Sequence, residues 1–328
     1  MSFKSRIMSD PSRSLASWGN LSLPMCQWQG VVCGLSRRRR GRVVVLDLGE
    51  LNLLGTITPA LGNLTYMRRL NLAQNHFHGA LPQELGNLHD LETRQLSNNS
   101  IQGQIPPSLS NCTRLVSISL QGNRLQGEIP SEFSSLHNLQ LLDLGENRLT
   151  GRIPLNIGSL VNLKHLILEF NNMTGEIPTE IGRLENLNEL SLGFNQFSGT
   201  LPTSLGNLSA LTFLSIPANE LEGSIPPLQS LLSLNVLELA QNKLEGSIPS
   251  FLGNLSSLKY LDFQENALVG QIPESLGSLG LLTTLSLSTN YLSGLIPDVL
   301  GNLQALTGLY IDTNKLEGFF PLSMLNLS

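Results

Sequence analysis

The stretch Leu285-Ser286-Leu287-Ser288-Thr289-Asn290-Tyr291-Leu292-Ser293-Gly294-Leu295-Ile296-Pro297 contains every recurring position of one unit that fills the chain. The pattern is L-x-L-x-x-N-x-L-x-G-x-I-P. Its asparagine returns every 24 residues, except for a step of 23 between Asn219 and Asn242, at Asn75, Asn99, Asn123, Asn147, Asn171, Asn195, Asn219, Asn242, Asn266, Asn290 and Asn314. An earlier unit carries Leu51 at the asparagine position but keeps its glycine, Gly55. A fixed period of this length predicts an array of twelve stacked repeats.

Each recurring position has a physical role. The alternating L-x-L segment predicts a short strand with its leucines inward, and stacked units place these strands in one parallel sheet. The asparagine amide both donates and accepts, so it can satisfy the buried turn after the strand. The glycine needs a positive φ or allows close backbone approach. Proline keeps the segment that leads back to the next strand extended. The L-G-x-L sequence that follows it predicts 3-10 turns or a loop.

Composition narrows the function. Only 5% of the 328 residues are aromatic and 14% are charged, which is typical of a repeat protein and not of a conventional enzyme core. The net charge of −5 argues against a nucleic-acid partner. One basic cluster, Arg37 to Arg40 with Arg42, stands apart. A solvated connector is the favoured interpretation of this cluster, with a polyanion site as the alternative.

The repeat resembles the plant-specific leucine-rich repeat, which is distinguished by its L-x-G-x-I-P extension. Residues 18–33, with Trp18 and the run Cys26-Gln27-Trp28-Gln29-Gly30-Val31-Val32-Cys33, resemble the N-terminal cap of that family. The chain is therefore similar to the ectodomains of plant receptor-like kinases, in particular to the immune-receptor group that includes the flagellin receptor and the rice bacterial-blight resistance receptor.

This resemblance implies an α/β right-handed solenoid, a horseshoe or superhelix, with a concave parallel sheet and a convex side of 3-10 turns and loops. It implies a partial cap over residues 1–42 and about twelve repeats over residues 43–328, without a C-terminal cap. It also implies a peptide or protein ligand, a co-receptor partner, and a location at the extracellular face of the plasma membrane.

The cysteines fit an oxidising compartment. Cys26 and Cys33 lie seven apart in the expected cap, which favours a disulfide over a zinc half-site that has no second ligand pair nearby. Closing so short a loop stabilises the fold by about 2.5 kcal/mol in the chain-entropy model. Cys112 is left over, and a buried structural thiol is the favoured interpretation.

Sequons for N-linked glycosylation support the same context. They occur at Asn20, Asn63, Asn98, Asn111, Asn172, Asn207, Asn254 and Asn326. Asn98 is expected to project from the strand face, where glycosylation would be inefficient.

The two ends differ from those of the complete family members. Residues 1–6 have no apolar segment of the kind found in signal peptides, and Phe3-Lys4-Ser5 followed by Asp10-Pro11 resembles the middle of the cap helix. No segment has the apolar length of a membrane span. The expectation is a fragment, from a truncated gene product or a partial sequence.

The binding residues are expected on the sheet face of repeats six to twelve, where variable positions change from small and polar to aromatic and acidic. These positions are Glu169, Phe170, Glu189, Phe194, Phe213, Glu238, Tyr260, Asp262, Glu265, Tyr310 and Asp312. Phe170 and Phe194 hold equivalent positions, so their side chains should lie about 5 Å apart across one strand spacing. Aromatic anchors beside carboxylates suit a peptide or protein with basic groups.

Arg94 and the absence of a catalytic motif are two further features of the sequence. Arg94 stands where neighbouring repeats have Leu70 and Ile118, so either its charged end reaches solvent or the repeat is locally loosened. No catalytic constellation, metal site or cofactor motif is expected, since Asp262 and Glu265 would lie on an open surface that cannot raise a carboxyl pKa. The alternative function is a secreted inhibitor resembling the polygalacturonase-inhibiting proteins, although those have cysteine-paired caps at both ends.

Overall fold

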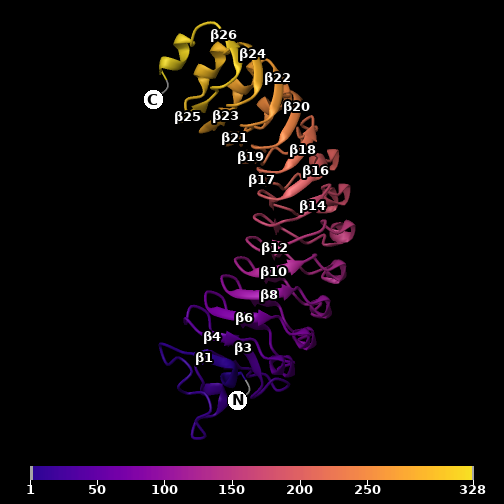
Figure 1. Ribbon diagram of the computed structural model, residues 1–328, viewed down its shortest axis with the longest axis vertical. Coiled ribbons are helices and arrows are strands. Elements are labelled where there is room, and N and C mark those ends of the chain that lie inside the picture. Colours follow the sequence, from indigo (N-terminus) through magenta and orange to yellow (C-terminus); the bar gives the residue numbers. More distant parts are fainter. Residues whose placement is uncertain (1–2, 327–328) are drawn as a thin grey trace. The chain divides into compact units, whose positions relative to one another are not determined.

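The computed structural model describes residues 3–326, with the side chains of Leu325 and Asn326 left undescribed. It contains two compact units, residues 1–163 (unit 1) and residues 164–328 (unit 2). Each unit is a stack of repeats, in which strands lie along one side and short helical coils along the other (Figure 1).

A parallel sheet runs through each unit, with one strand from every repeat. In unit 1 its repeat strands are β3 (Val43–Asp47), β5 (Arg69–Asn71), β7 (Thr93–Gln95), β9 (Ser117–Ser119) and β11 (Leu141–Asp143), and β2 (Val31–Cys33) of the cap pairs antiparallel with β3. In unit 2 they are β13 (His165–Ile167), β15 (Glu189–Ser191), β17 (Phe213–Ser215), β19 (Val236–Glu238), β21 (Tyr260–Asp262), β23 (Thr284–Ser286) and β25 (Gly308–Tyr310). Successive strands pair in register, as in Glu189 with Phe213.

A second set of short strands follows the asparagine of each repeat. In unit 1 these are β4 (Leu54–Thr56), β6 (His76–Ala80), β8 (Ser100–Gln104), β10 (Arg124–Gly127) and β12 (Arg148–Leu149), with β1 (Ile7–Ser9) antiparallel to β4. In unit 2 they are β14 (Thr174–Gly175), β16 (Gln196–Thr200), β18 (Glu220–Gly223), β20 (Lys243–Ser247), β22 (Ala267–Gly270), β24 (Tyr291–Leu295) and β26 (Lys315–Glu317).

The helical segments of the described residues are all 3-10 turns, which confirms the expectation for the L-G-x-L pieces. Unit 1 has η1 (Lys4–Arg6), η2 (Met25–Gln27), η3 (Pro59–Asn63), η4 (Gln83–Asn87), η5 (Pro107–Asn111), η6 (Ser131–Ser135) and η7 (Leu155–Ser159). Unit 2 has η8 (Thr179–Arg183), η9 (Thr203–Asn207), η10 (Ser250–Asn254), η11 (Glu274–Ser278), η12 (Asp298–Asn302) and η13 (Leu322–Asn326). The 23-residue repeat has no such turn at residues 226–230, because the deleted residue falls there.

The asparagine column forms a ladder of hydrogen bonds inside each unit. In unit 1, Asn123 Nδ2 donates to the carbonyl oxygens of Leu96, Leu120 and Gln121 at 2.9–3.2 Å, and Asn123 Oδ1 accepts from the backbone N–H of Ile101 at 3.0 Å. Asn195 repeats this arrangement in unit 2, with Met173 as the donor to its oxygen. Each amide therefore satisfies backbone groups of its own repeat and of the preceding one, as the sequence predicts.

The residue before each asparagine has a left-handed backbone. The φ angles of Gln74, Phe170, Phe194 and Glu265 lie between 53° and 55°. This conformation favours glycine or asparagine, so side chains at this position are held at a conformational cost. The recurring glycines from Gly79 to Gly318 adopt positive φ as well, for example 80° at Gly79, which confirms one of the two roles expected for that column. Gly55 shows the other role, since the backbone of Arg6 approaches it closely.

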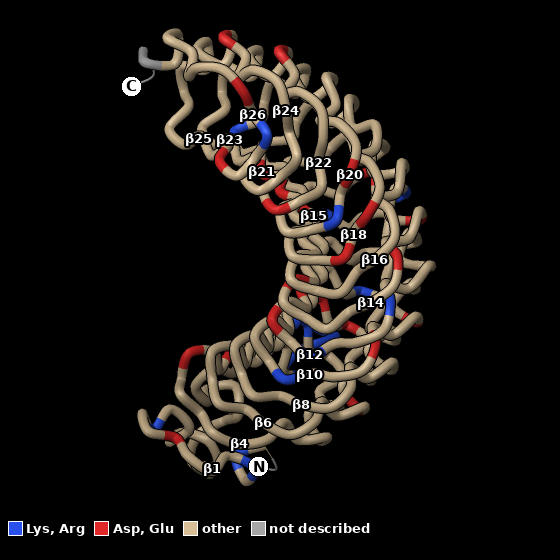
Figure 2. Tube along the Cα trace, turned by 45° about the horizontal axis from the view of Figure 1, so that its top comes forward, with Lys and Arg blue, Asp and Glu red and all other residues tan. Residues whose placement is uncertain are grey.

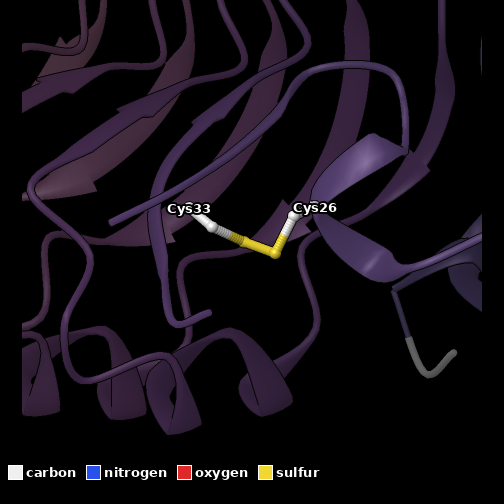
Figure 3. The surroundings of a disulfide bond; sticks show 2 residues. All are labelled: Cys26 and Cys33. Carbon is white, nitrogen blue, oxygen red and sulfur yellow. A yellow bond between two sulfur atoms is a disulfide. The ribbon is translucent and has the colours of Figure 1, made fainter. Parts of the chain in front are cut away.

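The N-terminal cap packs aromatic rings against the first repeats of unit 1. Trp18 contacts Phe3 and Trp28, with ring centroids 5.6 and 5.3 Å apart, and Trp18 Nε1 donates to the carbonyl of Gln29. Cys26 and Cys33 form the expected disulfide, with Cα atoms 5.5 Å apart (Figure 3). The helix expected over residues 3–11 was wrong: those residues form η1 and β1, and β1 pairs with the edge of β4.

Arg94 contradicts the expectation that its charged end reaches solvent. Its side chain is fully buried on β7, and none of its three guanidinium nitrogens has a hydrogen-bond partner. The expectation that the charged end reaches solvent is therefore wrong, because the whole side chain is buried. Cys112 is buried as expected and its thiol donates to the carbonyl of Leu85 at 3.4 Å.

Cys112 makes room for the larger arginine. It occupies a position that is Leu88 in the preceding repeat and Leu136 in the following one. The ionisation of Cys112 and that of Arg94 influence each other electrostatically, so the two side chains are neighbours. A smaller residue beside a larger one conserves core volume. Burial lowers the pKa of Arg94 to about 10, because the charged form loses its hydration.

No helix among residues 3–326 is long and apolar enough to cross a membrane.

Asn123→Ala should lower the free energy of unfolding by about 2–4 kcal/mol, because it leaves buried backbone groups of two repeats without partners. Urea unfolding followed by circular dichroism measures this change. Asn87→Ala, at an exposed position of η4, is the control and should change stability by less than about 0.5 kcal/mol. Equal losses in the two variants would contradict the ladder role.

Arg94→Leu should raise the free energy of unfolding at neutral pH by about 3 kcal/mol, since it removes an uncompensated buried charge. Because the pKa of Arg94 is lowered to about 10, the destabilisation by its buried charge is fully present below pH 10. This destabilisation decreases as the pH rises through that value and the guanidinium loses its proton. The advantage of the variant should therefore shrink above pH 10. Arg124→Leu, at an exposed position of β10, is the matched control and should give no comparable gain.

Candidate ligand-binding face

The open side of the unit 2 sheet, here called the ladder face, is formed by alternate residues of β13 to β25 and by the left-handed residue that follows each strand. Nine of the eleven predicted binding residues belong to these positions, and Glu169 and Asp312 directly precede the left-handed residue of their repeats. Six of the eleven form an aromatic pair, two hydrogen-bonded glutamates and a tyrosine–aspartate pair, and the other five are spread along the face.

Phe170 and Phe194 form a stacked pair. Their ring centroids are 4.2 Å apart and their planes differ by 7°, which agrees with the predicted separation of one strand spacing. Both rings are exposed, at 45% and 44%, although both residues adopt the left-handed backbone. A bulky residue in that region is uncommon and costs about 1–2 kcal/mol. The pair is therefore an apolar, solvent-facing platform that the fold does not require.

Carboxylates lie beside this platform. Glu169 accepts a hydrogen bond from Ser191 Oγ at 2.6 Å, and Glu189 Oε2 lies 2.8 Å from His165 Nδ1. Both glutamates remain partly exposed, so each keeps acceptor capacity for a further donor. The pair of Glu189 with His165 is ionic only when the imidazole is protonated.

Tyr260 anchors the second part of the face. Its hydroxyl donates to Asp262 Oδ2 at 3.2 Å, while Asp262 Oδ1 accepts from the backbone N–H of Gln264 at 2.9 Å. Partial burial, with the charges of Asp262 and Glu238, raises the pKa of Tyr260 to about 12. Asp262 was expected to project to solvent, but it is buried at 8% exposure, so it positions Tyr260 and is a poor direct contact.

The remaining predicted residues are partly or fully accessible. Glu238 accepts from Ser215 Oγ at 2.7 Å, and Glu265 accepts from Gln241 and Gln264. Hydrogen bonds from Ser288 and Thr313 hold the pKa of Asp312 below its ordinary value. Tyr310 is 54% exposed, and Phe213 is half-buried on β17.

Sequence reasoning missed the residues that orient these groups. Four polar side chains each contact one of the predicted glutamates: Ser191 with Glu169, Ser215 with Glu238, Gln264 with Glu265 and His165 with Glu189. The only available signal for Ser191, Ser215 and His165 was their register with an acidic residue one repeat away, whereas Gln264 is adjacent to Glu265 in sequence.

The two units carry opposite charge. Unit 1 holds fifteen Lys and Arg against ten Asp and Glu, whereas unit 2 holds five against fifteen. Acidic segments accordingly predominate over basic ones along unit 2 in Figure 2. The ladder face therefore lies in the strongly acidic unit, which agrees with a ligand that carries basic groups.

Glycans would be compatible with an open ladder face. The side chains of Asn20, Asn63, Asn98, Asn111, Asn172, Asn207 and Asn254 are all exposed, and the side chain of Asn326 lies outside the described part. Asn63, Asn111, Asn207 and Asn254 each end a 3-10 turn, on the side away from the ladder strands.

Family models match most of the sequence. A leucine-rich repeat N-terminal domain matches residues 1–34, single leucine-rich repeats match six segments between residues 66 and 208, and a leucine-rich repeat region matches residues 215–328. The chain belongs to the leucine-rich repeat family. This type of ectodomain is generally non-catalytic, and no group of three or more His, Cys, Asp or Glu within residues 3–326 could hold a metal ion.

Among plant receptors, the LRR receptor-like serine/threonine-protein kinase EFR of Arabidopsis thaliana is 50% identical over 78 residues, which is 24% of this chain and 7% of that protein. The PEPR1–AtPEP1 crystal structure superposes with a TM-score of 0.85 at 32% identity, covering 99% of this chain and 52% of that one. The structure of the Arabidopsis receptor kinase HAESA, solved with the peptide hormone IDA and the co-receptor SERK1, superposes with a TM-score of 0.71 at 29% identity. This match covers 99% of this chain and 67% of that one.

The sequence and fold of this leucine-rich repeat protein are thus those of plant receptor-kinase ectodomains. It spans only a small part of the receptor kinase EFR and about half of the PEPR1 chain.

Tyr260→Phe should remove a tyrosine ionisation step at about pH 12, because burial and the neighbouring carboxylates raise the pKa of Tyr260 to about 12. Spectrophotometric titration of tyrosinate measures this. Asp262→Asn should move the same step to lower pH, since it removes the hydrogen-bonded carboxylate next to the hydroxyl. A titration curve unchanged by both variants would contradict the proposed contact.

Proposed function

We propose that the ladder face of unit 2 binds an extended peptide or protein epitope carrying basic groups, along repeats six to twelve. The stacked pair of Phe170 and Phe194 beside Glu169 is the observation that carries this proposal. An exposed aromatic platform provides contact area at low conformational cost, and an adjacent carboxylate fixes the position of a cationic group.

The backbone conformation supports a functional reason for the pair. Glycine or asparagine would relieve the left-handed strain at both positions, and Gly122 and Asn98 do so at the equivalent positions in unit 1. Phenylalanine at two successive repeats retains the strain while adding nothing to the buried core. Strain kept at an exposed site is more readily explained by ligand contact than by folding.

The acidic groups supply the charge preference. Glu169, Glu189, Glu238, Glu265 and Asp312 lie on the ladder face, where Tyr260 and Tyr310 add further aromatic surface. An extended ligand would cross successive strands about 4.8 Å apart, so it could place side chains against several repeats. Specificity would then depend on the sequence of charges and rings along the face.

The relatives support a receptor context. PEPR1 and HAESA were solved with AtPEP1 and with IDA, and HAESA also with the co-receptor SERK1. By analogy, this chain supplies the non-catalytic recognition part of a receptor at the extracellular side of the plasma membrane, with a peptide or protein ligand and a co-receptor as partners. This analogy rests on fold and sequence similarity alone.

The double variant Phe170→Asn/Phe194→Asn should weaken peptide binding at least tenfold, because it removes both rings. Asparagine accepts the left-handed backbone, so the fold should be retained or slightly stabilised. The measurement is a panning of a displayed random-peptide library on the wild-type protein, followed by titration of the selected peptides against both proteins.

The matched control is Tyr291→Asn, which removes an exposed aromatic ring from β24, outside the ladder face. It should leave affinity unchanged. Selected peptides without Lys or Arg, or peptides that bind the double variant as tightly as the wild type, would overturn the proposal.

A further inference from the structure

A hairpin in unit 1 carries most of the basic cluster. Residues 34–42 connect β2 with β3, and the backbone N–H of Gly34 donates to the carbonyl of Arg42 at 2.9 Å. A tight turn closes the tip, where the N–H of Arg39 donates to the carbonyl of Ser36. The Cys26–Cys33 disulfide fixes the base of this hairpin. The arginines therefore lie on an exposed connector, as expected, and backbone hydrogen bonds give this connector a defined structure.

Asp90 joins the hairpin to the repeats. Arg39 Nη2 lies 3.0 Å from Asp90 Oδ2, and Arg114 Nη1 lies 3.2 Å from Asp90 Oδ1. One carboxylate thus holds two guanidinium groups that are far apart in sequence. Arg42 in turn lies over the ring of Tyr66, with its guanidinium carbon 5.6 Å from the ring centroid.

These contacts enclose a hollow of about 600 Å³ on the flank of unit 1. It is lined by Ser36, Arg37, Arg38, Arg39, Tyr66, Asp90 and Arg114. Arg114 also lines a second hollow of about 410 Å³, together with Glu92, Val116, Asn138, Gln140 and Asn162. The two hollows form a strip with guanidinium groups at one end and side-chain amides at the other.

The strip is strongly positive. Arg37, Arg38, Arg39 and Arg114 line the first hollow around the carboxylate of Asp90. The other carboxylate of the strip, Glu92 in the second hollow, is paired with Arg68. Within residues 3–326, Arg37, Arg38 and Arg40 make no ion pair, and all three are exposed. Guanidinium forks bind carboxylates in a bidentate manner, so this end of the strip is suited to an anionic group.

We propose that this strip binds an acidic saccharide, a sugar chain with uronate carboxylates. Arg37, Arg38 and Arg114 would bind the carboxylates, and Tyr66, which is 37% exposed, would pack against a sugar ring. The side-chain amides of Asn138, Gln140 and Asn162 would form hydrogen bonds with the sugar hydroxyls, since an amide offers both a donor and an acceptor. This site lies in unit 1 and is separate from the ladder face of unit 2.

An acidic protein segment is the competing ligand. Stable protein interfaces depend on apolar anchors buried near their centre. The lining of both hollows contains only Tyr66 and Val116 as large apolar or aromatic side chains. The chemistry of the strip therefore favours a sugar over a peptide.

The test is calorimetric titration of the whole chain with hexagalacturonate, its methyl-esterified form and poly-glutamate. Hexagalacturonate should bind with an affinity that falls as salt rises, and esterification should abolish binding. Arg37→Gln/Arg38→Gln should weaken binding about tenfold or more, since each arginine–carboxylate contact is a charge-assisted hydrogen bond. Tyr66→Leu should weaken binding of the saccharide but not of poly-glutamate.

Arg124→Gln/Arg148→Gln is the matched control, because it removes the same charge from exposed positions of β10 and β12 in unit 1. The affinity of this variant for hexagalacturonate should stay within about twofold of that of the wild type. Circular dichroism verifies that each variant is folded. Absence of hexagalacturonate binding, an equal loss in the control, or poly-glutamate binding as tight as that of the saccharide would each overturn the proposal.

Discussion

The asparagine ladder is the interaction on which both units depend. Each short strand ends in a buried turn, and the turn exposes backbone N–H and C=O groups that no helix or sheet satisfies. One amide per repeat pairs with carbonyl oxygens of two successive repeats and with an N–H of the second strand, as Asn123 does. The ladder thereby fixes the distance and the register between repeats, and the leucine layers pack in the space that it defines.

This constraint also decides where the chain can vary. Positions that face the core must remain apolar and of similar volume. Arg94 is an exception that destabilises the fold, because the smaller Cys112 beside it leaves space but provides no hydrogen bond to the guanidinium. The residue before each asparagine must adopt the left-handed backbone whatever its identity. Only the sheet-face positions and the flanks are free of both demands, so binding chemistry is concentrated there.

The repetitive part of the structure was predictable because its signals are local and repeated. The strands, the asparagine bonds, the positive φ of the glycine column, the 3-10 turns and the stacking of Phe170 with Phe194 all follow from one period. The burial of Arg94 and of Asp262 did not follow, since each depends on how neighbouring repeats cover one side chain. The attachment of the arginine hairpin to Asp90 joins residues 51 positions apart, and no periodic signal relates them.

The opposite charges of the two units show how one backbone supports different recognition chemistry. Hydrogen bonding along the ladder is the same in both, so charge on the surface has little effect on the register of the strands. In unit 2 the carboxylates lie among exposed rings on the ladder face, which suits a ligand with basic and apolar side chains. In unit 1 the guanidinium groups lie on the flank beside amides, with few apolar neighbours, which suits a hydroxyl-rich anion. The chemical class of each ligand is thus decided by what accompanies the charge, because charge alone attracts any partner of opposite sign.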